Sequence, residues 1–286
     1  MRFTKFAVAI AAAGALALSG CTGGGTTEAA PETPKVEFEA GSTMAKLQEA
    51  GKITVGTKFD QPLFGLMSPS GTPEGFDVEI AKIIASELGI DEKNITWKES
   101  VSANREPFIQ NGEVDMVVAT YTINDKRKEV VSFGGPYYMA GQDILVLKGN
   151  PEKIKSVDDL KGKNVCSVTG STSAANLQAA GANVLATDTY SNCLEPLRSG
   201  QVVAVSTDNV ILAGLASQNE GEFEVVDNPF TEEPYGIGIK KEDTQFRNFI
   251  NDTLEKAFKD GRWAKAWEKT AGKVLSTPTP PTVNRY

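Results

Sequence analysis

Gly75-Phe76-Asp77-Val78-Glu79-Ile80-Ala81-Lys82-Ile83-Ile84-Ala85 is the stretch with the clearest periodic pattern in this chain of 286 residues. Its apolar residues recur three and four positions apart, as they do on one face of an amphipathic helix. The pattern predicts a helix over 76–88, and Gly89 is suited to end it because glycine readily adopts the left-handed conformation that follows many helices. Residues 52–57, just before it, read as a β-strand.

Strands and helices alternate outward from this first pair. A first series has strands at 95–98, 114–122 and 144–147, and helices at 104–110 and after Asn124. A second series has strands at 165–168, 184–186, 202–205 and 235–240, helices between them, and two amphipathic helices at 245–259 and 262–269. Such alternation is typical of parallel sheets covered by helices. The two series therefore predict two α/β lobes.

The N-terminus has the layout of a secretory signal peptide. A basic start is followed by an apolar run at 6–18 and by Leu18-Ser19-Gly20-Cys21. The run is shorter than the ~20 apolar residues that a membrane-spanning helix needs. Cys21 follows residues that resemble a bacterial lipobox, which predicts a signal peptide over 1–20 and a lipidated Cys21. An ordinary signal peptide with a chance cysteine is the alternative. We expect an extracytoplasmic protein anchored to the cell membrane.

Composition excludes several classes of function. The chain has 37 acidic and 29 basic residues, and a net charge of −8 argues against binding nucleic acid. It has no histidine, which excludes histidine-dependent catalytic triads and histidine-ligated zinc. Residues 21–42 and 276–286 have few apolar residues. We expect the first to be a flexible tether and the second a C-terminal tail whose end can dock.

Two cysteines remain once Cys21 is lipidated. Outside the cell, such a leftover pair usually forms a disulfide, so we expect a bond between Cys166 and Cys193. Closing a loop of this length stabilises a protein by about 3 kcal/mol in the chain-entropy account. Two buried free thiols are the alternative.

The stretch from Gly75 to Ala85 resembles the signature of family 3 extracellular solute-binding proteins, the polar amino-acid receptors of ABC importers. The similarity continues in order from about Thr43 to Gly272, through 104–112, 120–127 and 170–173. It implies a type II periplasmic-binding-protein-like fold, in which each lobe is a sheet flanked by helices and two hinge strands join the lobes. Lobe 1 would be 43–138 plus 238–275, and lobe 2 would be 139–237.

The resemblance also implies a ligand site. Arg127 matches the arginine that holds the ligand α-carboxylate, and a guanidinium can grip a carboxylate with two parallel hydrogen bonds. Thr120 and Thr122 match partners of the α-carboxylate and α-ammonium. Thr172 matches a residue that closes over the α-carboxylate, and Asp208 matches the acid that pairs with the α-ammonium. From spacing alone, a solvated helix charge is the better explanation of Arg127, and Thr172 and Asp208 are explained by helix capping.

Two cations are expected near the ligand side chain. Lys58 matches a position that faces this side chain, and Arg105 matches an arginine that reaches the pocket in receptors for acidic amino acids. A buried cation is costly without a partner, so both favour a ligand with a second carboxylate. Exposed positions for both are the alternative. Ser102 stands where related receptors often have an aromatic side chain, which leaves one pocket wall undefined.

The expected function is capture without chemistry. The resemblance is closest to glutamate-binding lipoproteins, with aspartate, glutamine and asparagine left open as ligands. Lobe closure would deliver the ligand to a membrane permease, and we expect a monomer without cofactor, metal or enzymatic activity. The alternatives are an amino-acid sensor that presents its closed form to a signalling partner, and a dehydratase of cyclic acids with the same fold.

Overall fold

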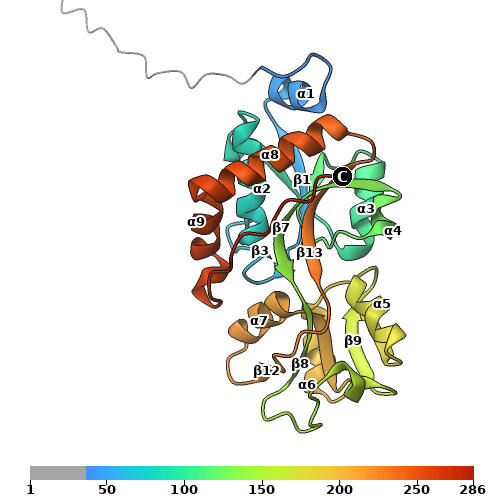
Figure 1. Ribbon diagram of the computed structural model, residues 1–286. Coiled ribbons are helices and arrows are strands. Elements are labelled where there is room, and N and C mark those ends of the chain that lie inside the picture. The colour runs from blue at the N-terminus through green and yellow to red at the C-terminus, as the bar shows by residue number, and fades with distance from the viewer. Residues whose placement is uncertain (1–36) are drawn as a thin grey trace, which may run out of the picture. The chain divides into compact units, whose positions relative to one another are not determined.

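The structure is a computed structural model that describes residues 37–286 (Figure 1). The predicted signal peptide and Cys21 lie outside the described residues. The described part belongs to one compact unit and contains two five-stranded sheets, each flanked by helices. None of its helices is long and apolar enough to cross a membrane.

Lobe 1 is built on a sheet with the strand order β5-β1-β6-β13-β7. β1 (Ile53–Thr57) runs parallel to β5 (Ile95–Glu99) and β6 (Met116–Val117). β13 (Glu233–Lys240) pairs antiparallel with β6 and with β7 (Val131–Ala140). The helices of this lobe are α1 (Thr43–Ala50), α2 (Phe76–Glu87), α3 (Arg105–Gln110), α4 (Asp125–Lys128), α8 (Thr244–Asp260) and α9 (Arg262–Lys269), with 3-10 turns at Glu92–Asn94, Ser102–Asn104 and Ala271–Lys273.

Lobe 2 is built on a sheet with the order β10-β9-β11-β8-β12. Its strands are β8 (Gln142–Leu147), β9 (Asn164–Val168), β10 (Asn183–Thr187), β11 (Ala204–Asp208) and β12 (Phe223–Val225). Its helices are α5 (Thr172–Ala179), α6 (Leu194–Arg198) and α7 (Asn209–Gln218), with 3-10 turns at Val157–Leu160 and Ser191–Cys193. The predicted disulfide is confirmed, because Cys166 on β9 is bonded to Cys193.

Two strands connect the lobes. β7 continues through Gly141 into β8, and the chain returns from β12 to β13, which pairs with β7 along most of its length. In Figure 1, β7 and β13 lie side by side and run from the lobe 1 sheet toward lobe 2. The predicted two-lobed α/β fold with two hinge strands is confirmed.

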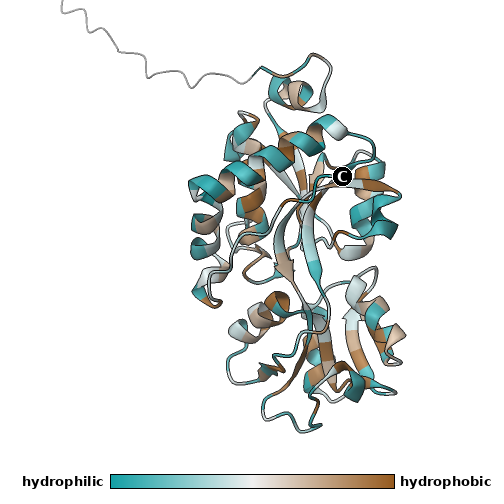
Figure 2. Cartoon of the chain, viewed as in Figure 1, coloured by the Kyte–Doolittle hydropathy of each residue, from teal (hydrophilic) through white to brown (hydrophobic). Residues whose placement is uncertain are grey.

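α2 shows why the opening stretch folds as predicted. Its apolar face carries Phe76, Ile80 and Ile84, all fully buried. The ring of Phe76 packs edge-on against Trp267 of α9, with 5.1 Å between the ring centres. Figure 2 shows this division, with hydrophobic residues facing the sheets and hydrophilic residues facing outward. The helix starts after Gly75, whose φ is +133° and where a Cβ would lie only 2.3 Å from the backbone of Phe64. Only glycine fits there.

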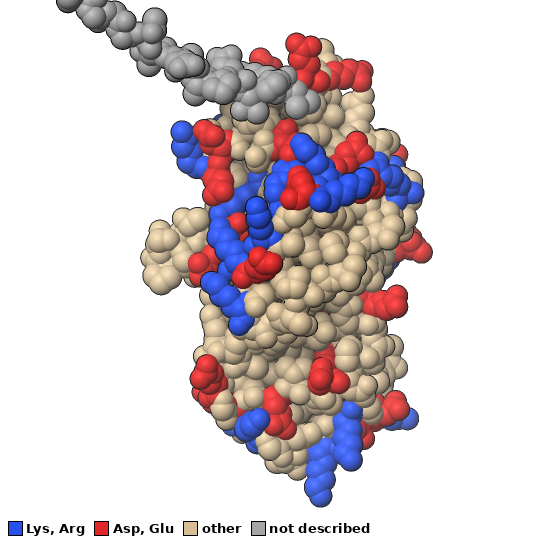
Figure 3. Space-filling view, turned by 60° about the vertical axis from the view of Figure 1, so that its left-hand side comes forward, with Lys and Arg blue, Asp and Glu red and all other residues tan. Residues whose placement is uncertain are grey.

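The charged surface of the helices consists largely of paired residues. On the face shown in Figure 3, basic and acidic side chains are interspersed. Glu87 of α2, for example, pairs with Lys256 of α8 at 3.0 Å and with Arg262 of α9 at 2.7 Å. These contacts join the outer helices to α2.

The structure differs from the sequence prediction at several places. The strand expected over 114–122 is limited to β6, and the chain bends after it at Thr120, whose φ is +44°, before Thr122 pairs with Tyr235 of β13 in an isolated bridge. β12 and the first half of β7 were not predicted. The end of the expected tether packs on lobe 1, where Phe38 contacts Phe249 at 5.4 Å between ring centres.

The end of the C-terminal tail docks, as the sequence analysis allowed. Asn284 N–H donates to Gly135 O of β7 in lobe 1 at 2.8 Å.

Candidate ligand-binding site

A small and narrow polar cavity lies between the lobes. Lobe 1 contributes residues that follow the carboxyl ends of its strands, and lobe 2 contributes the starts of α5 and α7, where ligands bind in open α/β sheets. Five of the seven predicted ligand-binding residues line it, namely Arg105, Thr120, Thr122, Thr172 and Asp208. Ser102, Tyr190 and Ile211 are among the other lining residues.

Lys58 is buried directly after β1, with 2% of its surface exposed. Its Nζ donates to the Oγ of Ser102, which lines the cavity, at 2.8 Å. The pKa of Lys58 is lowered to about 7, mainly by burial and also by the charge of Arg105, while Asp60 and Asp77 act in the opposite direction. The exposed alternative for Lys58 is therefore wrong.

Arg105 is also buried, with 2% of its surface exposed, at the start of α3. Its Nε donates to Ser102 O, and its Nη1 donates to the carbonyl oxygens of Ala119 and Thr120, all at 3.2 Å. Its guanidinium lies 4.4 Å from the ring centre of Tyr121. These partners are all uncharged, so they orient the guanidinium without neutralising it.

Thr120 is held in its left-handed conformation by Asp77 of α2. Its N–H donates to Asp77 Oδ2 at 2.7 Å, while Asp77 Oδ1 accepts from the hydroxyl of Tyr137 at 2.6 Å. The hydroxyl of Thr120 lies 3.0 Å from Gln61 Oε1. Burial raises the pKa of Asp77 to about 7, against the hydrogen bonds from Tyr137 and Thr120, which lower it. The conformation costs energy, and strain of this kind is found most often at functional sites.

Arg127 lies at the boundary between the lobes, 7% exposed and outside the set of residues that line the cavity. Its Nη1 donates to Thr122 O at 2.7 Å, and its Nη2 donates to Gly170 O of lobe 2 at 3.2 Å. Its Nε lies 3.2 Å from Glu106 Oε1. Burial lowers the pKa of Arg127 to about 10, so the side chain stays charged at neutral pH. It is not a solvated helix charge.

Thr172 is the first residue of α5, and the helix is capped by its neighbour. Ser171 Oγ accepts from Ala174 N at 3.0 Å. The Thr172 hydroxyl instead donates to Glu233 Oε2 of β13 at 2.9 Å. Thr172 is thus tied to the hinge strand and faces the cavity.

Asp208 ends β11 immediately before α7, but its side chain does not cap that helix. Its Oδ2 accepts from the hydroxyl of Tyr235 at 2.5 Å. Its Oδ1 is buried and has no hydrogen-bond partner among residues 37–286. Burial raises the pKa of Asp208 to about 7, and the charge of Glu233 adds to the rise. A buried acceptor without a partner, beside a polar cavity, suits a ligand with a cationic donor.

Sequence reasoning missed three contributors to this site. Asp77 was read only as part of a helix start, although a carboxylate among buried apolar residues signals a buried hydrogen-bond network. Gln61 and Tyr190 have no local pattern that predicts their position, because Gln61 ends a two-residue strand (Asp60–Gln61) and Tyr190 lies in a bend. Tyr190 N–H donates to Asp60 Oδ2 across the lobes at 2.9 Å.

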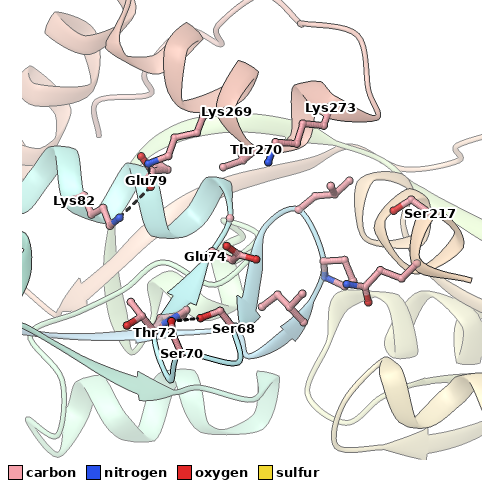
Figure 4. A pocket seen from close by; sticks show the side chains of 16 residues that line it. Ser68, Ser70, Thr72, Glu74, Glu79, Lys82, Ser217, Lys269, Thr270 and Lys273 are labelled. Atoms are coloured by element: carbon pink, nitrogen blue, oxygen red, sulfur yellow. Dashed lines mark hydrogen bonds and ion pairs between the residues drawn. The ribbon is translucent and has the colours of Figure 1, made fainter.

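A second, larger groove lies on the outer surface where the lobes meet (Figure 4). Lobe 1 provides most of its lining, and Ser217 and Gln218 at the end of α7 provide the rest. Glu79 lies within it between Lys82 at 3.1 Å and Lys269 at 2.9 Å. No cluster of three or more metal-ligating residues occurs here or elsewhere in 37–286.

Two α/β lobes joined by two strands and meeting around a small polar cavity define a two-lobed small-molecule-binding protein. Residues 53–273 match the profile of the bacterial extracellular solute-binding proteins, family 3, and the chain belongs to this family.

The names of similar proteins are consistent with this family. The chain is 42% identical to glutamate-binding protein GluB of Corynebacterium efficiens, over 85% of this chain and 88% of that protein. It is 43% identical to the ABC transporter glutamine-binding protein GlnH of Bacillus subtilis, over 86% of this chain and 88% of that protein. Among solved structures, an ancestral arginine-binding protein bound to glutamine matches with a TM-score of 0.72 and 39% identity, over 77% of this chain and 97% of that one.

Proposed function

We propose that this protein is the extracytoplasmic receptor of an ABC importer and that it captures glutamate between its lobes. The family and the named relatives support a receptor for an amino acid. They leave open which amino acid this chain binds, because relatives of almost equal identity are named for glutamate and for glutamine. The choice between glutamate and glutamine is therefore argued from the residues of the site.

One observation carries the choice of glutamate. Lys58 and Arg105 are both buried beside the cavity, and neither has a carboxylate ion-pair partner among residues 37–286. A buried cation is expensive unless an anion compensates it. The side-chain carboxylate of glutamate would supply that anion, whereas the amide of glutamine would not.

The α-groups of the ligand would be held at the other side of the cavity. The unpartnered Oδ1 of Asp208 is suited to accept from the α-ammonium. Thr120, Thr122 and Thr172 line the cavity and are suited to bind the α-carboxylate. Arg127, at the edge of the cavity, would join them by exchanging its bonds to Thr122 O and Gly170 O for bonds to the ligand. Because lobe 1 and lobe 2 each supply part of this set, the ligand would stabilise the closed arrangement over an open one.

Glutamine is the second candidate. It has the same α-groups, and relatives named as glutamine-binding proteins are 42–43% identical to this chain. The pKa of about 7 for Lys58 gives it specific support, because a neutral amine accepts a hydrogen bond from an amide. The two candidates therefore differ in the charge that Lys58 carries when the ligand is bound.

We infer delivery to a permease, with the receptor held at the membrane as a monomer by a lipid on Cys21. The names of the relatives describe binding proteins, which favours capture over dehydration of a cyclic acid. Uptake of labelled glutamate in a strain that lacks this protein would separate import from sensing, since a sensor would leave uptake unchanged.

Calorimetric titration of the mature, lipid-free protein with glutamate, aspartate, glutamine and asparagine tests the ligand. We expect glutamate to bind tightest. Aspartate should bind more weakly, because one methylene changes affinity by about 10- to 200-fold in a fitted pocket. Glutamine binding tighter than glutamate at pH 6, where Lys58 is protonated, would overturn the glutamate assignment.

A further inference from the structure

α7 of lobe 2 is seated directly on the backbone of lobe 1. Ile211, Gly214 and Ser217 lie three residues apart and so share one face of this helix. Ile211 lines the ligand cavity and Ser217 lines the outer groove, where Figure 4 shows it at the edge of α7. Gly214 lies between them, at the point of contact with Pro62 of lobe 1.

The contact at Gly214 leaves no room for a side chain. A Cβ at this position would lie 2.4 Å from Pro62 O, 3.1 Å from Pro62 C and 3.3 Å from Pro62 Cβ. The atoms in the way belong to backbone and a proline ring, which cannot turn aside as a flexible side chain would. The φ of Gly214 is ordinary for a helix, so the helix itself does not require glycine here.

The segment around Pro62 is fixed to lobe 1. Gln61 is fully buried, and its Oε1 accepts from the hydroxyl of Thr120 at 3.0 Å. Leu63 O accepts from Phe76 N at the start of α2 at 2.7 Å. Because this segment is held in place, it cannot move away from an added methyl group on α7. The clash would therefore be relieved by moving the lobes apart.

We propose that Gly214 sets how far the lobes close and thereby sets ligand affinity without contacting the ligand. This inference rests on the proposed capture by lobe closure, but not on which amino acid is captured. A helix interior normally favours alanine over glycine. Gly214→Ala should thus stabilise α7 while it obstructs the closed state, so folding and binding should change in opposite directions.

The test compares wild type, Gly214→Ala and Gly214→Ser, with Gln218→Ala as the control. Gln218 is exposed at the end of the same helix. Each protein is titrated with the amino acid, among the twenty standard ones, that the wild type binds tightest. Thermal unfolding without ligand and small-angle scattering with saturating ligand are measured in parallel.

We expect Gly214→Ala to weaken binding about tenfold or more, as overpacking of a rigid contact does, and Gly214→Ser to weaken it at least as much. The loss should appear as faster dissociation, with a larger radius of gyration when ligand is bound. The unfolding midpoint without ligand should equal or exceed that of the wild type, and Gln218→Ala should bind normally. Affinity of Gly214→Ala within twofold of wild type, or a weakened affinity with an unchanged ligand-bound radius, would overturn the proposal.

Discussion

Arg127 of lobe 1 donates through Nη2 to the carbonyl oxygen of Gly170 in lobe 2, at 3.2 Å. Its Nη1 is bonded to Thr122 O within lobe 1. The same guanidinium thus contacts both lobes at the edge of the cavity. Its charge is partly balanced by Glu106, which is itself only partly buried. We therefore expect this residue to affect both ligand affinity and lobe closure.

Arg127→Ala should weaken glutamate binding by about 100-fold or more, because removing one partner of a buried charge pair costs about 3–5 kcal/mol. Calorimetry on the variant measures the loss. Lys126→Ala is the matched control, since Lys126 is the exposed neighbour on the same helix. Near wild-type affinity in Arg127→Ala would remove Arg127 from the carboxylate site.

Lys58→Met tests the distal part of the pocket, because methionine keeps most of the volume and removes the charge. A hydrogen bond to a charged group contributes about 1.5–3 kcal/mol. Glutamate should therefore lose about 10- to 100-fold in affinity, and glutamine distinctly less. Competition between the two ligands measures the ratio directly. Equal losses for both ligands would show that Lys58 does not face the ligand side chain.

The ratio of glutamate to glutamine affinity should fall as pH rises from 7 to 8.5. Burial holds the pKa of Lys58 at about 7, and a bound carboxylate would raise it. Above pH 7, glutamate must therefore take up a proton at Lys58 in order to bind, and its affinity falls by up to about tenfold per pH unit. Asp208, whose pKa is also raised to about 7, is proposed to bind the α-ammonium common to both ligands, so its titration should cancel in the ratio.

Titrations in buffers of different ionisation enthalpy would count the protons taken up. Glutamate binding at pH 8 should take up protons in the wild type but not in Lys58→Met. A glutamate-to-glutamine ratio that stays constant from pH 7 to 8.5 would contradict the assignment of Lys58 to the ligand carboxylate.

Much of the fold was accessible from the sequence, because it depends on local patterns. The apolar face of α2 consists of residues three and four positions apart in the sequence. Phe76 and Ile80 are buried, as that spacing predicts. The early end of β6 was not accessible. The chain bends there at the left-handed Thr120, whose N–H donates to Asp77, 43 residues away in the chain.

The site residues could be predicted only where they match positions that have a known role in the family. Lys58, Arg105 and Asp208 are buried together, but nothing local in the sequence indicates their depth. Gly214 shows the limit most clearly. In the sequence, a glycine inside a helix indicates only a weak helix former. The close contact between Gly214 and Pro62 of the other lobe appears only in the folded structure.

The C-terminal residues form a strap across lobe 1. Val283 is buried, and Asn284 N–H donates to Gly135 O of the edge strand β7. The hydroxyl of Tyr286 accepts from Phe133 N at 2.9 Å. Its ring lies 4.6 Å from Nζ of Lys128, the residue after Arg127 on α4. The strap thus covers an open sheet edge and braces the helix that carries Arg127.

Deletion of residues 283–286 should lower the free energy of unfolding by about 2 kcal/mol, mainly through the loss of one buried aliphatic side chain. Urea unfolding measures this change. Arg285→Ala is the control, because its ion pairs with Asp252 and Glu255 are largely exposed and contribute at most about 1 kcal/mol. Glutamate affinity should fall in the deletion variant as well, since α4 loses its contact with Tyr286. If the deletion leaves both stability and affinity unchanged, the strap has no mechanical role, and the edge of β7 is stable without it.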